Sequence, residues 1–450
     1  MKRKLALLLS LLITASSLCA CGDPTQLSDD EKLSADYTRS SSYEDTYNYS
    51  DGATSAPQSY NTYSSSITNF ELKFFRKYYS QLEDKNESFV LNPASTTLQI
   101  ATIMNGATGD TKDEISLALG SDLTLANINQ CSSYFKSRLE AVSKLSSGEV
   151  DELSGKKQEA SDTEYIKFEN DLFFNDTSDV KTSFLKTNAE YYGSNIFRFM
   201  FSDENALTKI NSQFSSFTAK NAISDLDSKN TLISITASDI SDKWLESYAE
   251  SDIEKGTFKS DSGDKEVNFM TSNEYMIKSD KAVGVIKYTS KNPLKLVLVM
   301  PNEGTSLEDY VADFTNLEYS TLVDSMDITK KVTAKIPEFS IKSKETAQPL
   351  SSALTESGLY SLFTDEATFG NISNSDDFML NEMYEITPEI SVSAAGIGGL
   401  GNEDTSATVK ERTKELEETD ETIEFNRPFI FLLIDNESEI PVYIGTVNNI

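Results

Sequence analysis

Histidine is absent from this chain of 450 residues. Its absence excludes a Ser-His-Asp or Cys-His catalytic centre, a histidine general base and a zinc site with histidine ligands. Ser-x-x-Lys pairs occur at Ser133/Lys136 and Ser183/Lys186, but the companion Lys-Thr-Gly and Ser-Asp-Asn elements are missing. Acidic pairs such as Asp29/Asp30 and Asp376/Asp377 lack the spacing of a calcium loop. We therefore predict that the protein is not an enzyme and carries no metal or cofactor.

Basic residues are scarce. The chain has 40 Lys and Arg against 72 Asp and Glu, which gives a formal net charge of −32. Nucleic-acid binding needs a basic footprint, so this balance excludes a nucleic-acid partner. A high net charge favours a soluble, monomeric protein.

Long apolar runs are also missing, apart from residues 5–18 behind the basic Lys2, Arg3 and Lys4. That run is shorter than the roughly 20 residues of a spanning helix, and its position is typical of an export signal. Its end, Leu18-Cys19-Ala20-Cys21-Gly22, resembles the bacterial lipoprotein cleavage box. The resemblance implies removal of residues 1–20 and lipidation of Cys21; an ordinary secretory signal is the alternative.

Cysteine is limited to three residues. Cys19 would leave with the signal and Cys21 would carry lipid, so Cys131 has no intrachain partner. Cys131 lies in a stretch of helical character. We predict a small buried hydrophobic side chain rather than a reactive thiol.

Residues 21–66 are rich in Ser, Thr, Tyr and Asp and poor in aliphatic side chains. Such a composition buries too little apolar area to offset the entropy of ordering, so we expect a disordered tether. Residues 67–450 then show helical spacing first and strand-like runs later, which indicates an α+β fold. Helices are expected from about residue 69, from residues 92–95 up to Gly106, and at 111–119, 184–192, 204–221 and 350–357. Strands are expected at 165–174, 232–237, 285–289, 294–301, 332–339, 384–390, 428–434 and 441–447.

A polar excursion of about thirty residues separates the last predicted strands, and structureless connections beyond roughly 12–15 residues usually carry function or disorder. It includes Gly396, Gly398 and Gly401 in a G-x-G-x-x-G pattern. This pattern cradles phosphate in dinucleotide-binding folds. Too little chain follows for such a fold, and residues 409–418 have no apolar stripe to pack on a sheet, so we reject a nucleotide site.

Several separate segments resemble the serpin family and occur in that family's order. They span nearly all of residues 69–450. The segments are Asn92-Pro93-Ala94-Ser95, residues 106–111, Asn170-Asp171-Leu172-Phe173, residues 232–235 with Lys243-Trp244, residues 297–304, Ile336-Pro337-Glu338-Phe339, residues 354–359, Phe425-Asn426-Arg427-Pro428-Phe429-Ile430-Phe431 and Ile444-Gly445-Thr446-Val447-Asn448.

The resemblance implies a fold and a mechanism. Helices would pack around a large central mixed sheet with further sheets, and the long excursion would be an exposed reactive-centre loop. A target protease cleaves such a loop, which then inserts as a strand into the sheet while the protease is held as an acyl-enzyme. The resemblance places the loop hinge at Glu389, Ile390, Ser391, Val392, Ser393, Ala394 and Ala395, and gives structural roles to Trp244, Asn170, Pro428 and Gly445.

Two residues depart from the family's hinge. Ile390 stands where glycine is usual, and Pro388 stands near a usual acid. A β-branched side chain is stiff, and proline fixes φ and removes a donor. These departures favour a second hypothesis, a non-inhibitory binding protein at the cell surface. For the small-residue stretch of residues 391–401 itself, a flexible Gly/Ala linker is the alternative.

Two counts place the reactive bond differently. Counting forward from the hinge places it at Asp404–Thr405, which we take as the prediction. Counting back from Phe425 places it at Glu417–Glu418, so the loop is lengthened. Lys410, Arg412 and Lys414 would attract trypsin-like proteases, whereas Ala407 or Val409 would suit elastase-like ones.

The sequence therefore predicts a serpin-like suicide inhibitor of endopeptidases. Its expected partner is a serine or cysteine protease. It would be exported and either held at the cell surface by lipid on Cys21, its one membrane contact, or secreted.

Overall fold

The structure, a computed structural model, describes residues 23–39, 56–145, 164–218, 220–290, 293–342, 344–375, 378–386, 389–398 and 416–450. Cys21, Pro388, Asp404 and Thr405 lie outside the described residues. Within the described ranges, no helix combines the length and apolar character that crossing a bilayer requires.

Helix α3 shows how the helical part forms. The Asn92 side chain caps its start by accepting a hydrogen bond from the Ser95 N–H at 2.7 Å, and Pro93 occupies the first turn, as predicted. All twelve residues of α3 are buried. The helices are α2 (Tyr60–Gln81), α3 (Pro93–Met104), α4 (Gly109–Gly120), α5 (Leu125–Leu145), α6 (Thr182–Tyr192), α7 (Ala206–Gln213), α8 (Leu307–Asp313), α9 (Asn316–Asp324) and α10 (Ser351–Glu356), with short 3-10 turns η1 (Asp29–Glu31) and η2 (Glu250–Asp252).

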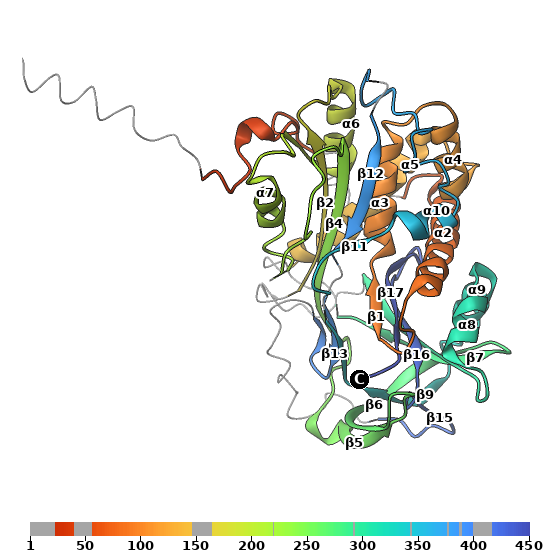
Figure 1. The fold of residues 1–450 in the computed structure, drawn as a ribbon. Coiled ribbons are helices and arrows are strands. Elements are labelled where there is room, and N and C mark those ends of the chain that lie inside the picture. Colours follow the sequence, from red (N-terminus) through yellow and green to blue (C-terminus); the bar gives the residue numbers. More distant parts are fainter. Residues whose placement is uncertain are drawn as a thin grey trace, which may run out of the picture.

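The eight-stranded sheet is built on the long strand β4, which runs down the molecule beside β2 (Figure 1). Along its main path the strands lie in the order β10-β13-β14-β4-β12-β11, with β2 pairing β4 and β3 pairing β2. Its strands are β2 (Tyr165–Asn175), β3 (Asn195–Phe199), β4 (Leu232–Lys243), β10 (Phe339–Ile341), β11 (Gln348–Pro349), β12 (Leu380–Glu385), β13 (Ile390–Ser393) and β14 (Gly396–Gly398).

The nine-stranded sheet follows the order β1-β17-β16-β8-β7-β6-β9-β15, with β5 pairing β6. Its central strands β8, β16 and β17 are buried along their whole length. The strands are β1 (Phe89–Leu91), β5 (Ile253–Phe258), β6 (Lys265–Lys278), β7 (Ala282–Tyr288), β8 (Leu294–Pro301), β9 (Lys331–Pro337), β15 (Thr422–Glu424), β16 (Phe429–Asp435) and β17 (Pro441–Val447).

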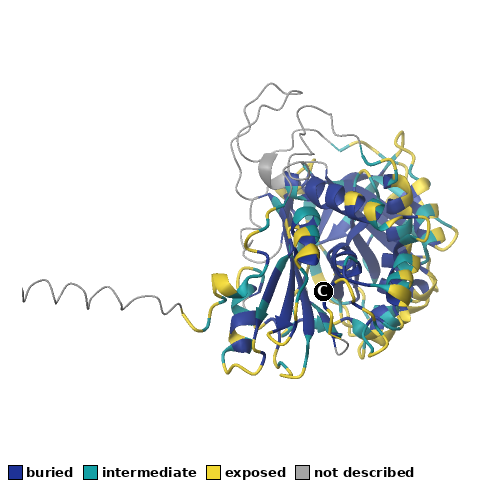
Figure 2. Ribbon diagram, turned by 90° about the horizontal axis from the view of Figure 1, so that it is seen from above, coloured by how far each residue is buried: buried dark blue, intermediate teal, exposed yellow. Residues whose placement is uncertain are grey.

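Both faces of the eight-stranded sheet are covered by core residues. Successive residues of a strand point to opposite faces, so one strand contributes to two cores. Leu232 and Ile240 of β4 belong to the main core with α2, α3 and α5, whereas Ile233 and Ile235 join a smaller core that includes Ile210 of α7. Figure 2 shows most of the strands coloured as buried and the exposed residues toward the outside of the molecule. Core residues therefore cover both faces of the sheet.

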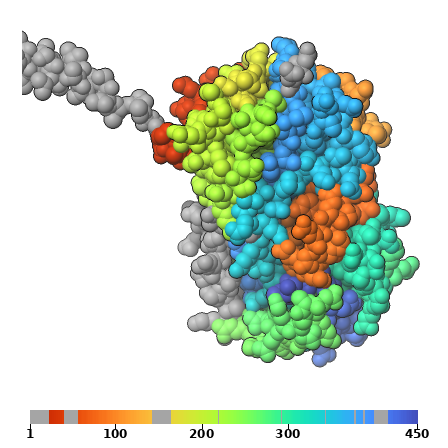
Figure 3. All heavy atoms as spheres, in the orientation of Figure 1, coloured from red at the N-terminus to blue at the C-terminus, as the bar shows by residue number. Residues whose placement is uncertain are grey.

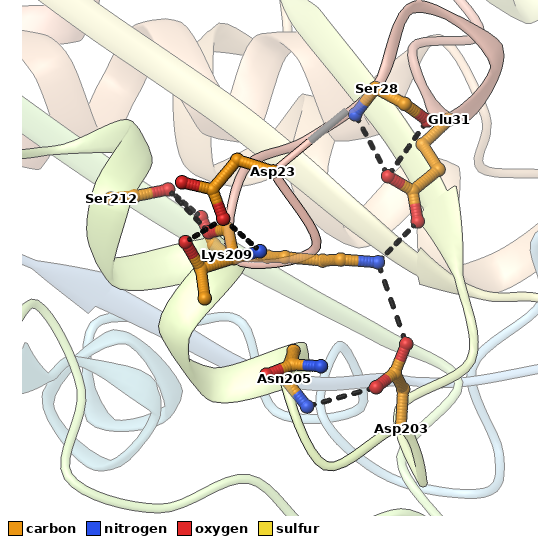
Figure 4. A network of polar contacts seen from close by, with 8 residues as sticks. Asp23, Ser28, Glu31, Asp203, Asn205, Lys209 and Ser212 are labelled. Carbon is orange, nitrogen blue, oxygen red and sulfur yellow. Dashed lines mark hydrogen bonds and ion pairs between the residues drawn. The ribbon is translucent and has the colours of Figure 1, made fainter. Parts of the chain in front are cut away.

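The start of the described chain differs from the predicted tether. Residues 23–39 lie on the edge strand β3, where Ser34 N–H donates to the Ile196 carbonyl and Ile196 N–H donates to Ser34 Oγ at 3.1 Å. Lys209 of α7 binds Glu31 at 2.7 Å and Asp203 at 3.5 Å (Figure 4). In space-filling view this segment covers the surface beside α7 (Figure 3).

Helix α2 also begins at Tyr60, nine residues before the predicted start at residue 69. Its first turns are polar in sequence, yet Tyr60 and Tyr63 are buried. The described parts of the predicted tether are therefore ordered, because a few apolar side chains (Leu27, Leu33 and Tyr37) pack on the two cores. A prediction of disorder from average composition misses a few apolar side chains that pack on a core.

Candidate functional site: a loop that enters its own sheet

The predicted hinge begins as a strand. Ile390–Ser393 form β13, which pairs antiparallel with β10, with Ile390 opposite Ile341 and Val392 opposite Phe339. The side chains of Ile390 and Val392 are buried in the main core. Ile390 therefore packs as a core residue instead of serving as a flexible pivot. Glu389 precedes the strand and is half-buried.

The chain reverses at Ala394 and Ala395, the last two residues of the predicted hinge. Gly396 then has φ +151°, and β14 returns antiparallel to β13. A Cβ on Gly396 would lie 2.1 Å from the Asp242 carbonyl oxygen, so this position requires glycine. The first glycine of the rejected nucleotide pattern is thus the residue that lets the loop turn into the sheet.

A strand can insert in the eight-stranded sheet beside β4, between β4 on one side and β13 and β12 on the other, and we call this position the slot. Strand β14 occupies one half of it. It lies between β13 and β4, with Gly396 opposite Lys243 and Gly398 opposite Ser241. In the other half of the sheet, β12 pairs directly and in parallel with β4, from Leu380 to Glu385. The start of the loop is therefore already a strand of the sheet, and further insertion would have to separate β12 from β4.

Two side chains hold the turn. The indole N–H of Trp244 donates to the Ser393 carbonyl at 2.7 Å, and the Ala394 N–H donates to Glu338 Oε1 at 3.3 Å. Trp244 is 2% exposed. Trp244 follows β4 and Ser393 ends β13, so the hydrogen bond between them joins the two strands on either side of β14 at the end of the slot.

Polar side chains line the buried face where β12 meets β4. Gln99 of α3 donates to Ser234 Oγ at 2.6 Å, and Ser95 donates to Asn170 Oδ1 at 2.8 Å. Glu385, the last residue of β12, accepts from the Asn92 N–H at 2.9 Å and from Thr96 Oγ1 at 3.2 Å. Burial raises the pKa of Glu385 to about 7, although these hydrogen bonds oppose the shift.

The other end of the loop is tied to the nine-stranded sheet. Asn273 of β6 accepts from the Glu417 N–H at 2.7 Å and donates to the Glu417 carbonyl at 3.2 Å. Thr333 of β9 contacts Thr419, and Thr333 N–H also donates to the Glu421 carbonyl. Strand β15 then pairs in parallel with β9. The backbone of Glu417 is therefore held on the body of the protein, which disfavours Glu417–Glu418 as a bond offered to a protease.

The remaining predicted residues lie in structural positions. A Cβ on Gly445 would lie 2.0 Å from the Phe89 carbonyl oxygen, and Pro428 immediately precedes β16. Asn170 is buried in β2. Cys131 is fully buried, as predicted, and burial raises the pKa of its thiol to about 12.

Sequence reasoning missed the residues that fix the two ends of the loop. Glu338 belongs to the family-like segment Ile336–Phe339, but that resemblance did not indicate a contact with the loop, and no motif marks Asn273. Gly396 lay in the glycine pattern of the sequence, but that pattern alone did not mark it as the residue at which the loop turns into the sheet.

The fold and the loop together define a class of protein whose large sheet accepts its own loop. Residues 65–450 match the family model described as Serpin (serine protease inhibitor). An uncharacterized serpin-like protein of Methanosarcina mazei is 23% identical over 396 residues, which cover 84% of this chain and 85% of that protein.

Solved structures show the same fold. The native state of the thermophilic serpin tengpin superposes with a TM-score of 0.71 at 22% identity, covering 88% of this chain and 95% of tengpin. Human thyroxine-binding globulin superposes with a TM-score of 0.68 at 18% identity, covering 86% of this chain and 99% of that one. The chain belongs to the serpin family, and the predicted α+β serpin fold is confirmed. Serpins are mainly protease inhibitors and not enzymes, so family and fold support a protease inhibitor in general.

Proposed function

We propose that this protein inhibits an endopeptidase irreversibly, by inserting its cleaved loop into the eight-stranded sheet while the protease is bound to it as an acyl-enzyme. The observation that carries the proposal is β14, a segment of the loop that already lies between β13 and β4. A strand already in place gives the following loop residues a register to extend once β12 separates from β4.

The register of β14 predicts how far insertion runs. Gly396 lies opposite Lys243 in an antiparallel pair, so continued insertion would bring Ala407 opposite Leu232, the first residue of β4. A reactive bond at or beyond Ala407 would use the whole slot. The predicted bond, Asp404–Thr405, lies outside the described residues and would stop three residues short.

The chain between Ala407 and the held Glu417 contains Lys410, Arg412 and Lys414. Proteases that cleave after basic residues are therefore the first targets to test. A lipid on Cys21 would hold the inhibitor at the cell surface, and mass spectrometry of palmitate-labelled protein from a bacterial host tests that part of the proposal.

The decisive experiment is incubation with serine proteases of trypsin-like and elastase-like specificity and with a papain-like cysteine protease, followed by denaturing gels. We expect a covalent complex with at least one of them, and mass spectrometry of the released peptide locates the cut. Proteases inactivated at their nucleophile should give no complex. Cleavage by every protease without any complex would refute the proposal.

A substitution in β14 tests in the same assay whether complex formation needs the loop to enter the sheet. Ile397 of β14 is 2% exposed and packs in the main core, so Ile397→Glu should keep the loop out of the sheet. We expect this variant to be cleaved without forming a complex. Ala395→Glu adds the same charge at the half-buried turn and serves as the control.

A non-inhibitory surface protein is the second candidate, and Glu403 favours it. In the register of β14, Glu403 would come opposite Thr236 and point to the same buried face as Ile397. Thyroxine-binding globulin shows that a protein of this fold can bind a small molecule instead. If Glu403 blocks insertion, Glu403→Ala should produce covalent complexes that the unchanged protein does not form.

A further inference from the structure

Trp244 lies at the point where the loop enters the sheet, and it is the only tryptophan of the chain. Little regular structure fixes its segment. Residues 244–248 follow the end of β4, with one isolated bridge from Trp244 to Thr289 and a hydrogen bond from Leu245 N–H to the Tyr288 carbonyl. Trp244 packs in the main core, and a charged side chain adds to that packing in setting the direction of the indole ring.

Lys287 of β7 is that side chain, and it contacts the segment at three points. Its Nζ lies 5.1 Å from the centre of the Trp244 ring and 4.4 Å from the centre of the Tyr248 ring. The same ammonium donates to the Glu246 carbonyl at 3.3 Å. Lys287 thus holds every second residue of the segment, two by cation–π contacts and one by a hydrogen bond.

A buried carboxylate keeps Lys287 charged and in place. Glu274 of β6 accepts from Lys287 Nζ at 2.8 Å, and the two side chains are 8% and 2% exposed. Burial alone would lower the pKa of Lys287, but Glu274 and, after it, Tyr248 outweigh burial, and the pKa lies above its usual value. The ammonium therefore keeps its donors over the whole physiological pH range.

Stability alone explains the buried ion pair between Lys287 and Glu274 poorly. Apolar residues of similar size would fill the same space at equal or lower free energy, because two charges must be stripped of water to form the pair. What apolar residues would not supply is a cation that orients an indole ring toward a carbonyl.

We infer that Lys287, held by Glu274, is a positioning residue for loop insertion: it orients Trp244 so that the indole N–H binds Ser393 and keeps β14 in the register from which insertion starts. This inference rests on the proposed function for its inhibitory consequence, but the orientation of Trp244 can be measured without a protease.

The principal variant is the double change Lys287→Met with Glu274→Gln, which leaves no unpaired charge in the core. We expect Trp244 to become several-fold more accessible to acrylamide quenching, with an altered emission maximum. Lys287→Arg keeps a cation and should restore most of the protection. The matched control is Lys295→Met with Glu439→Gln, because Lys295 of β8 is 4% exposed and binds Glu439 at 2.9 Å without a contact to Trp244.

The second readout is the partition between covalent complex and cleaved inhibitor. Slower insertion gives the bound protease more time to escape, so the double variant should yield several-fold more cleaved inhibitor per complex, while the Lys295 control keeps the original ratio. An unchanged ratio together with unchanged quenching in a folded double variant would overturn the inference. If the original protein forms no complex with any protease, the proposed function fails, and the quenching experiment still decides the role of Lys287.

Discussion

Glu385 is the buried carboxyl that lies where the eight-stranded sheet must open. Its pKa is raised to about 7 from a usual 4.5, with Asn92 and Thr96 as its hydrogen-bond donors. The raised pKa means that the folded state binds this proton more tightly than the unfolded state does. Its contribution to stability is therefore present below about pH 4.5 and is lost as the pH rises through 7.

Replacing Glu385 by glutamine should flatten this pH dependence. Between pH 5 and pH 8 we expect the original protein to lose on the order of 3 kcal/mol through Glu385, and Glu385→Gln to lose that much less. Denaturant unfolding of both proteins at the two pH values measures the difference. Glu382→Gln, on the same strand but partly exposed, is the control. Parallel pH profiles for Glu385→Gln and the original protein would contradict the assignment.

Gly396 is the residue whose backbone admits the loop to the sheet. Gly396→Ala combines φ +151° with a contact of 2.1 Å to the Asp242 carbonyl, so we expect β14 to leave the slot. The strain corresponds to about 1–3 kcal/mol. Hydrogen exchange of residues 396–398 should lose its protection. Gly263→Ala is the control, because Gly263 has φ +118° but no atom near its Cβ position.

At the scale of elements, the anchor of the loop's far end lies on β6. Asn273→Ala removes both hydrogen bonds to the Glu417 backbone, about 1–2 kcal/mol together. We expect limited proteolysis to cut near Glu417 faster than in the original protein. Asn302→Ala, which loses one bond to the Asp280 carbonyl elsewhere on the surface, should leave that rate unchanged. Equal cutting rates in both variants would argue against the anchor.

The segment of residues 23–39 is the element that covers the free edge of β3. Deleting it exposes the Ile196 N–H and carbonyl and the apolar surface under Leu27 and Leu33. An exposed strand edge recruits other chains, so we expect a lower unfolding midpoint and self-association in size-exclusion chromatography with light scattering. Changing the exposed Asp29 and Asp30 to Asn should have neither effect.

The sequence predicted elements well where local chemistry decides them. Asn92 and Pro93 set the start of α3, and the apolar runs of β8, β16 and β17 were found with nearly their true ends. It failed at β13, because Ile390 and Val392 fit either a stiff hinge or a buried strand, and only their pairing with β10 decides between the two. The same holds for Glu338 and Lys287, whose roles depend on strands distant in sequence.

On the scale of the whole molecule, the structure joins two sheets through one loop, with β14 at one end and β15 at the other. While the loop is intact, the bonds at Asn273 and Thr333 limit how much chain can follow β14 into the slot. Under the proposed mechanism, cleavage would remove that limit. The cleaved protein would then form backbone hydrogen bonds that the uncleaved protein does not form.

This difference predicts a large effect of loop cleavage on thermal stability. Insertion along β4 would form about ten backbone hydrogen bonds, and at roughly 1 kcal/mol each the gain is of order 10 kcal/mol. For a domain of this size, such a gain raises the unfolding midpoint by about 10 °C or more. Calorimetry before and after limited proteolysis measures it, and Ile397→Glu, cleaved in the same way, should show little rise because its loop stays outside. A midpoint that does not move after cleavage of the original protein would mean that β14 marks the end of insertion and not its start.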